Sequence, residues 1–314
     1  MAVQHPVVGA IDIGGTKIAV GAIDAAGRVL AKDVAPTRAA AGFDAAMERV
    51  EAMLEAVCTR AAVELRGIGI GATGPIDPMS GEIGVVEFLA DWQGCNPVER
   101  LSAHFGLQVA MENDADAAAL GELLWGAGRG KRHLICVTIG TGIGCGIVHN
   151  GVLYRGVDGA HPEIGHHVIE ASGPACYCGA NGCWEVLARG PAIAARLADA
   201  APADYPQRDS LTAEVVCELA RRGDPLARHE IEREAHYLGV GVANLVTLYA
   251  PELIVLSGSV MNGADLFVPT IRAVVLRSCG LVPAARVEIL PAGNGGDAPL
   301  IGAGAVWHHR HGQH

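Results

Sequence analysis

Short apolar runs separated by glycine turns fill the beginning of the chain. Residues 6–13 are apolar and rich in β-branched side chains, which predicts a buried strand. Gly14 and Gly15 then turn the chain into a second apolar run at residues 18–23, and a third strand is expected beyond a turn at residues 24–27. The glycine turn therefore joins two strands, which we expect to be antiparallel, and it opens no helix.

The same pattern of strand, glycine turn and strand occurs again later in the chain. Residues 134–140 form an apolar run, residues 141–144 turn it, and residues 145–149 return. Each loop taken alone is explained as a tight hairpin, but two copies favour two related lobes whose glycine amides grip a polyphosphate. Neither copy fits the dinucleotide-binding fingerprint, which opens a helix, and the chain has no P-loop motif.

Periodic apolar positions predict several further elements. Helices are expected at residues 115–126, 239–248 and 298–307, and a buried strand with a glycine turn is expected at residues 251–259. The fold class is therefore α/β. The His-rich tail that begins at Trp307 is expected to be a frayed, solvated terminus.

The composition is that of a globular protein with two lobes. The chain has 314 residues, of which 50% are hydrophobic, and this exceeds one ordinary core. We place one lobe at residues 1–115 plus 299–314 and the other at residues 116–298. The net charge of −11 argues against general binding to nucleic acid or to acidic membranes. The first residues lack a signal-peptide pattern, and no uninterrupted apolar run is long enough to span a membrane, so a cytoplasmic location is expected.

A cluster of cysteines marks residues 161–185. Cys176, Cys178 and Cys183 follow the pattern C-x-C-x4-C, and His166 precedes them. Three thiolates and one imidazole are the ligand set of a closed tetrahedral zinc site, and a reducing cytoplasm favours a metal over a disulfide. His167 is an alternative to His166 as the fourth ligand. The other six cysteines are scattered and are expected to be core residues or incidental thiols.

Five motifs resemble those of the ROK family, in the expected order and over essentially the whole chain. They are DIGGTK, ENDADAAALGE, IGTGIG, EIGH followed by CYCGANGCWE, and LSGSV. That family includes sugar kinases of the actin-like ATPase superfamily and related repressors. The resemblance implies a two-lobed actin-like ATPase fold of the ribonuclease H type, with a cleft between the lobes and a structural zinc loop.

The resemblance implies that the two glycine loops bind the phosphates of ATP. Asp12 would hold Mg²⁺, either directly or through water. Lys17 either adds charge at the phosphates or only covers the turn. Gly258 is expected to let the backbone lie against the adenine or the ribose. The other residues implied in nucleotide binding are Gly14, Gly15, Thr16, Gly140, Thr141, Gly142 and Gly144.

The resemblance also implies a sugar pocket in which Asp114 is the general base. Asn113 and Asp114 end a strand just before a predicted helix, so either is also a natural N-cap. In the functional interpretation, Asn113 hydrogen-bonds a sugar hydroxyl and Asp114 accepts the proton of the attacking hydroxyl. His166 would offer one ring nitrogen to zinc and the other to a hydroxyl. The remaining sugar contacts are expected at Gly74, Glu163 and Glu185, although both glutamates could also be ordinary surface charges.

Two segments depart from the family pattern near the expected sugar pocket. Thr73 stands where proline is usual, and Phe88 and Leu89 stand where an Asn-Leu pair is expected. The HPE before Ile164 is closer to fructose-directed members, whereas the C-x-C-G motif is closer to glucose-directed ones. We therefore expect a hexose kinase with glucose first, and with fructose, mannose, N-acetylmannosamine or N-acetylglucosamine as alternatives.

A sugar-responsive repressor is the competing interpretation. Repressors of this family carry a helix-turn-helix domain before the first strand, whereas only six residues precede that strand here. With the acidic net charge, this favours an enzyme that binds neither nucleic acid nor membranes. A homodimer, or else a tetramer, is the expected assembly.

Overall fold

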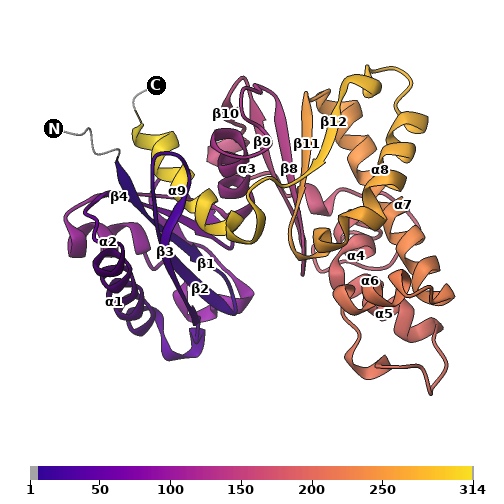
Figure 1. Ribbon diagram of the computed structural model, residues 1–314, viewed down its shortest axis with the longest axis horizontal. Helices are drawn as coiled ribbons and strands as arrows, with labels where there is room; N and C mark the ends of the chain where they lie inside the picture. The colour runs from indigo at the N-terminus through magenta and orange to yellow at the C-terminus, as the bar shows by residue number, and fades with distance from the viewer. Residues whose placement is uncertain (1–5, 313–314) are drawn as a thin grey trace. The chain divides into compact units, whose positions relative to one another are not determined.

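The computed structural model describes residues 6–312, and the chain forms two compact units (Figure 1). Of the described residues, the first unit comprises residues 6–130, 146–162 and 292–312, and the second comprises residues 131–145 and 163–291. Each unit is built around strands of a five-stranded sheet, so the α/β class predicted from the sequence is confirmed.

The sheet of the first unit has the strand order β3-β2-β1-β4-β7. Its strands are β1 (Val7–Ile13), β2 (Lys17–Ile23), β3 (Val29–Pro36), β4 (Leu65–Ala72) and β7 (Gln108–Asn113). The first three strands are antiparallel neighbours, as the glycine turn predicted, whereas β1, β4 and β7 run parallel. The carboxyl ends of the three parallel strands therefore meet at one edge of the sheet.

Helices cover both faces of this sheet (Figure 1). Helices α1 (Phe43–Ala61) and α2 (Pro97–Phe105) pack on one face, and α9 (Ala298–His311) packs on the other, with α3 (Asp114–Leu124) beside it. A short hairpin of β5 (Ile76–Asp77) and β6 (Glu82–Ile83) adds a separate two-stranded sheet.

The alternation of side chains along β1 divides the core of this unit into two layers. Ile11 and Ile13 belong to the cluster that includes the buried side chains of α1, whereas Val8 and Ala10 pack with Trp307 of α9. Because α9 continues through His311, the prediction of a frayed tail from Trp307 is wrong for the described residues. The reason is packing: Trp307 is only 9% exposed.

The second sheet has the strand order β10-β9-β8-β11-β12. Its strands are β8 (Leu134–Ile139), β9 (Ile143–His149), β10 (Val152–Leu153), β11 (Leu253–Ser257) and β12 (Glu288–Pro291). Strands β8, β11 and β12 are parallel, whereas β9 and β10 are antiparallel. The second predicted strand, glycine turn and strand unit is thus present as β8 and β9.

Helices of the second unit gather around one long helix, α7 (Pro225–Tyr249). It contacts α4 (Trp184–Ala188), α5 (Gly190–Ala200), α6 (Ala213–Arg221) and α8 (Ala264–Ser278). The helix expected from the sequence is only the C-terminal part of α7, because the N-terminal part carries many charged residues that obscure its apolar stripe.

One described segment, Ser259–Ser278, is long and apolar enough to pass a composition test for membrane crossing. Phe267, Ile271 and Val275 of this segment are buried among the neighbouring elements, and core helices of soluble proteins pass the same test.

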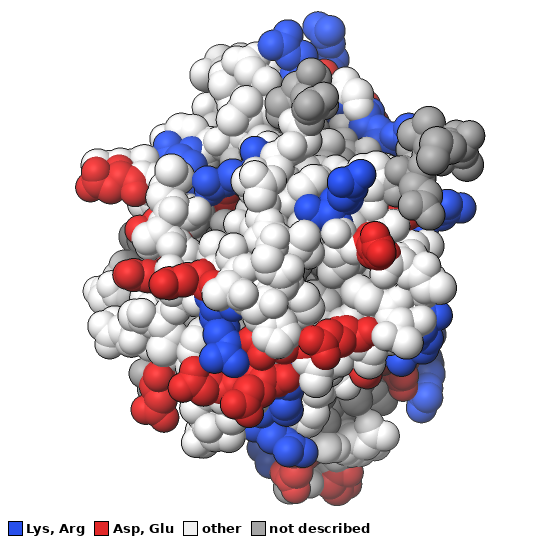
Figure 2. Space-filling view, turned by 90° about the vertical axis from the view of Figure 1, so that its left-hand side faces the viewer, with Lys and Arg blue, Asp and Glu red and all other residues white. Residues whose placement is uncertain are grey.

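Figure 2 shows one face of the molecule, on which acidic side chains gather in a band while lysine and arginine side chains lie scattered. This distribution agrees with the net charge of −11.

Candidate functional site

The structure places the predicted site residues in two groups, one in each unit. The first unit holds Asp12, the turn at residues 14–17, Gly74, Asn113 and Asp114. The second unit holds the loop at residues 140–144, Glu163, Glu185, Gly258 and the predicted metal ligands.

The first group forms at the carboxyl ends of three parallel strands. Asp12 of β1 pairs with Gly71 of β4, and Ala72 of β4 pairs with Asn113 of β7. Asp114 follows as the first residue of α3. Parallel register brings these strand ends to one edge, which is where open α/β sheets bind their ligands.

Asn113 and Asp114 both act at the N-terminus of α3. The backbone N–H of Ala115 donates to Oδ1 of Asn113 at 2.9 Å and to Oδ1 of Asp114 at 2.8 Å. A Cβ placed on Gly74 would lie 2.9 Å from Nδ2 of Asn113, so the turn after β4 lies against that amide. Capping is therefore observed, and the positive end of the helix favours an ionised Asp114.

Asp12 lies in an environment that opposes its ionisation. Burial raises its pKa to about 7, the negative charge of Asp114 adds to the increase, and Lys17 opposes it. A divalent cation would reverse this balance, because it neutralises neighbouring carboxylates. The oxygen-only donor set of Asp12 suits Mg²⁺, which is commonly held by one or two carboxylates together with substrate phosphates.

The first glycine turn is held in shape by Thr37, which sequence reasoning missed. The hydroxyl of Thr37 donates to the carbonyl of Gly14 at 2.6 Å, and its N–H donates to the carbonyl of Thr16 at 3.0 Å. Within the turn, the N–H of Gly14 donates to the carbonyl of Lys17 at 3.0 Å. Thr37 is fully buried just beyond β3, and no local sequence pattern distinguishes it.

A buried ion network behind the N-terminus of α3 was also missed. Asp116 is 1% exposed and accepts hydrogen bonds from Arg155 at 2.5 Å, while Nδ1 of His161 lies 2.7 Å from the same carboxylate oxygen. Arg155 also donates to Glu112 of β7, and Arg310 of α9 donates to Glu112 at 3.2 Å. The network ties the segment before Glu163 to the strand and helix that carry Asp114.

In the second unit, Glu185 supports the second glycine loop. Its Oε2 accepts from the backbone N–H of Ile143 at 2.9 Å, and a Cβ placed on Gly142 would lie 2.5 Å from the same oxygen. The carbonyl of Gly140 accepts from the N–H of Gly190 at 2.8 Å. The absence of a side chain at Gly142 therefore lets a buried carboxylate approach the loop backbone.

The backbone conformation and the packing at position 258 both favour glycine. Its φ of 92° lies in the left-handed region that favours glycine, and a Cβ there would lie 2.3 Å from the carbonyl oxygen of Ile139. The residue is therefore required where the turn after β11 passes the end of β8. Its expected contact with the nucleotide stays a prediction.

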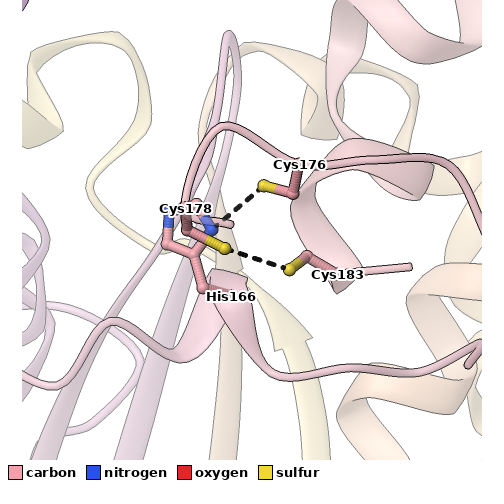
Figure 3. A group of neighbouring side chains, drawn as sticks. All are labelled: His166, Cys176, Cys178 and Cys183. Carbon is pink, nitrogen blue, oxygen red and sulfur yellow. Dashed lines mark hydrogen bonds between the residues drawn. The ribbon is translucent and has the colours of Figure 1, made fainter. Parts of the chain in front are cut away.

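The four predicted metal ligands converge (Figure 3). The ligand atoms of His166, Cys176, Cys178 and Cys183 all lie within 4.8 Å of one another. Sγ of Cys178 lies 3.5 Å from Sγ of Cys183, and Sγ of Cys176 lies 3.5 Å from Nδ1 of His166. A tetrahedral ion with Zn–S bonds of ~2.3 Å sets sulfurs about 3.8 Å apart, so the cluster fits zinc. His167 instead points Nδ1 at the carbonyl of Ile164, 2.6 Å away, so it is not the fourth ligand in this arrangement.

The second ring nitrogen of His166 faces a residue that the sequence did not indicate. Nε2 of His166 lies 2.9 Å from the hydroxyl of Tyr177. Desolvation of that hydroxyl, followed by the carboxylates of Glu185 and Glu163, raises the pKa of Tyr177. Of the residues predicted to bind sugar in this unit, His166 therefore contacts the phenol, and the charges of Glu185 and Glu163 act on it.

Comparison with known proteins identifies the family. Residues 8–310 match the family model described as the ROK family. The chain belongs to the ROK family. This ROK protein is 35% identical over 276 residues to the glucokinase of Streptomyces coelicolor, across 83% of this chain and 84% of that protein. It is 30% identical to the xylose repressor of Bacillus spizizenii, across 77% of this chain and 61% of the repressor.

A solved structure supports the same assignment. The ROK protein superposes with a TM-score of 0.81 on the ROK family glucokinase of Streptomyces griseus, which was solved in complex with glucose and AMPPNP. The two are 32% identical, and the match covers 95% of this chain and 98% of the other. The family membership and the actin-like ATPase fold that the motifs predicted are therefore confirmed.

Proposed function

We propose that this protein phosphorylates glucose to glucose 6-phosphate with ATP as the phosphoryl donor. It is an ATP-dependent sugar kinase of the ROK family, as its similarity to the Streptomyces glucokinases shows. The observation that carries the proposal is Asp114, which stands at the N-terminus of α3 beside Asn113 and close enough to Asp12 to raise its pKa.

Asp114 is the proposed general base. It accepts the proton of the attacking hexose hydroxyl while Asn113 holds a neighbouring hydroxyl, and the helix N-terminus keeps the carboxylate ionised. Asp12 would hold Mg²⁺, which supplies charge neutralisation at the phosphates. The turn at Gly14 to Lys17 and the loop with Thr141 and Gly144 contact phosphate oxygens through backbone amides other than that of Gly14, which is bonded to the carbonyl of Lys17. Such contacts matter because phosphoryl transfer depends mainly on positioning.

The cysteine cluster is proposed to hold a structural zinc ion. Four protein ligands fill a tetrahedral shell and leave no open position for a substrate or water, which is typical of structural sites. Residues 166–183 contain little regular secondary structure, so the ion would fix the backbone that presents Glu163, His166 and Glu185. These three side chains are the proposed acceptors and donors for sugar hydroxyls.

The sugar itself is chosen by residues near the first glycine turn. A Cβ on Gly15 would lie 2.8 Å from Cβ of Phe88, so this departure from the family pattern lies directly on the turn. Thr73 lies close by, with its N–H donating to the carbonyl of Ile13 at 3.0 Å. Glucose is proposed first, and fructose, mannose and the two N-acetylhexosamines remain the alternatives.

Three further properties are proposals that rest on the family and on the chemistry. The division into lobes at residues 1–115 plus 299–314 and 116–298, and assembly as a homodimer, follow from the resemblance. A cytoplasmic location would keep the cysteine cluster as thiolates.

A regulator is the second candidate function, favoured by the similarity to the xylose repressor.

A coupled assay over a panel of hexoses and N-acetylhexosamines tests the proposal. With Mg²⁺ and ATP we expect glucose to give the highest kcat/KM, and Asp114→Asn to lower kcat by about 10²- to 10⁴-fold because a general base is lost. The control is Asp199→Asn, the same change at an exposed position of α5, which should keep full activity. Normal turnover by the Asp114 variant would contradict the base assignment, and inactivity of the wild type on every sugar would favour a regulator.

A further inference from the structure

Tyr177 stands among the groups proposed to bind sugar, although it is neither a metal ligand nor part of a predicted site. It lies between Cys176 and Cys178 in the chain, and its hydroxyl is 2.9 Å from Nε2 of His166. The two rings meet edge to face, with centroids 4.9 Å apart and an interplanar angle of 86°. The zinc loop therefore carries its own hydroxyl group into the proposed sugar pocket.

The hydrogen-bonding roles around this hydroxyl follow from the orientation of His166. Its Nδ1 faces Sγ of Cys176 at 3.5 Å within the metal cluster (Figure 3), so Nε2 is the nitrogen left to carry a proton. The phenol oxygen then accepts from Nε2–H. Desolvation raises the pKa of the phenol, and the negative charge of Glu185 adds to the increase. A sugar hydroxyl can accept the same hydrogen bond from Nε2–H.

We propose that the hydroxyl of Tyr177 occupies the place that one hexose hydroxyl takes at Nε2 of His166. The ring swings away when the sugar binds, so Tyr177 sets the affinity of the pocket. This inference rests on the proposed function, because it takes His166 as a sugar contact.

Two features of the structure favour displacement of the ring over a permanent role. Tyr177 is 78% exposed, so little packing holds its ring in place. Glu185 is 7% exposed and keeps its bond to the N–H of Ile143, so its carboxylate stays in position when the phenol leaves. The pocket is thus kept in its binding geometry by a group that the substrate can replace.

Removal of the phenol hydroxyl tests the inference. With D-glucose as the probe and no nucleotide present, we expect Tyr177→Phe to lower the Kd about three- to ten-fold, because the sugar no longer competes with an internal hydrogen bond. Any change in kcat should be smaller than the change in Kd, since the base is untouched. The matched control is Tyr154→Phe, the same change at an exposed tyrosine outside the zinc loop, which should leave the Kd unchanged.

A second measurement follows Tyr177 in the wild-type protein. Protein labelled with 3-fluorotyrosine gives a ¹⁹F resonance for Tyr177, assigned by its loss in Tyr177→Phe, and we expect this resonance to shift when D-glucose is added. A Kd equal to or above the wild-type value in Tyr177→Phe, or a resonance that glucose does not move, would overturn the inference. If the wild type neither binds nor phosphorylates any hexose, the proposed function fails and the inference fails with it. If the wild type binds glucose normally, only the inference is at stake.

Discussion

Asp12 and Asp114 are two acidic residues that interact, and their interaction makes ionisation of Asp12 less favourable. Burial and the neighbouring carboxylate raise the pKa of Asp12 to about 7, so an ionised Asp12 is unfavourable without a cation. Perturbed carboxylates of this kind gather at functional sites, where a bound ion or substrate relieves them. The pair therefore agrees with the proposed magnesium and general-base roles.

A second buried acid, Glu234 of α7, supplies a pH prediction. Arg196 donates to Glu230 at 2.8 Å and to Glu234 at 2.5 Å, so two buried acids share one guanidinium. Burial raises the pKa of Glu234 from 4.5 to about 7, with Glu230 adding to the increase. Between pH 4.5 and 7 the folded state therefore binds more protons than the unfolded state. The stabilising contribution of Glu234 is complete below pH 4.5 and is lost as the pH rises through 7.

The expected loss from this group is on the order of 3 kcal/mol in the free energy of unfolding between pH 4.5 and 8. Glu234→Gln should remove that dependence, because the amide does not titrate. Urea unfolding at several pH values measures it, with Glu232→Gln as the control at an exposed position of the same helix. Parallel pH profiles for the wild type and Glu234→Gln would contradict the assignment.

At the scale of elements, residues 166–183 contain little regular secondary structure and carry the four proposed metal ligands. Hydrogen bonds between residues of this loop hold its backbone, among them the bond from the N–H of Cys176 to the carbonyl of Ala180 at 2.8 Å, and Val168 forms a bridge with Cys183. The free energy of binding a structural metal becomes folding free energy for such a segment. The loop should therefore depend on its metal more than the helices of the same unit do.

We expect metal analysis to find about one zinc ion per chain, as four protein ligands predict. Cys183 is fully buried, and Cys183→Ser should lower the zinc content well below one, reduce the Tm and raise the KM for hexose on the order of ten-fold. Cys58→Ser, at a thiol of α1 outside the cluster, should change none of these. A wild-type preparation that is metal-free yet fully folded and active would refute the zinc site.

Element boundaries show where local patterns are reliable. The strands β1, β2, β8 and β9 lie where the apolar runs predicted them, because the glycine turns between them are encoded locally. Helix α7 begins at Pro225, well before the predicted start at residue 239. Its first turns are stabilised by a cap from Asp224 and by packing against α5 and α6, and these tertiary contacts leave a weak pattern in the sequence.

At the scale of the whole molecule, a helix from near the end of the chain packs on the sheet that the beginning of the chain starts. Helix α9 contacts β1, β4 and β7, so the core of the first unit depends on residues far apart in the sequence. The ring of Trp307 fills space that a side chain at residue 67 would take: a Cβ on Gly67 would lie 1.8 Å from its Nε1. This contact joins residues far apart in the chain and is expected to be important for stability.

Trp307→Ala should therefore destabilise the protein by about 3–5 kcal/mol, the usual cost of removing a buried aromatic side chain. The control is Leu281→Ala, at a fully exposed apolar residue, which should stay within about 0.5 kcal/mol of wild type. Denaturant unfolding compares the two. A Trp307 variant as stable as the Leu281 variant would show that α9 is not essential to the first unit.

The sequence by itself determined those features of the candidate site that depend on short, local patterns of residues. The glycine turn after Asp12, a helix N-cap at Asn113 or Asp114 and the cysteine spacing around Cys176 depend on neighbouring residues, so they can be predicted without the fold. Tertiary structure alone decided which distant side chains serve those motifs. Thr37 at the first glycine turn and Tyr177 opposite His166 have no sequence signature, because side-chain direction and contact depend on how separate elements pack.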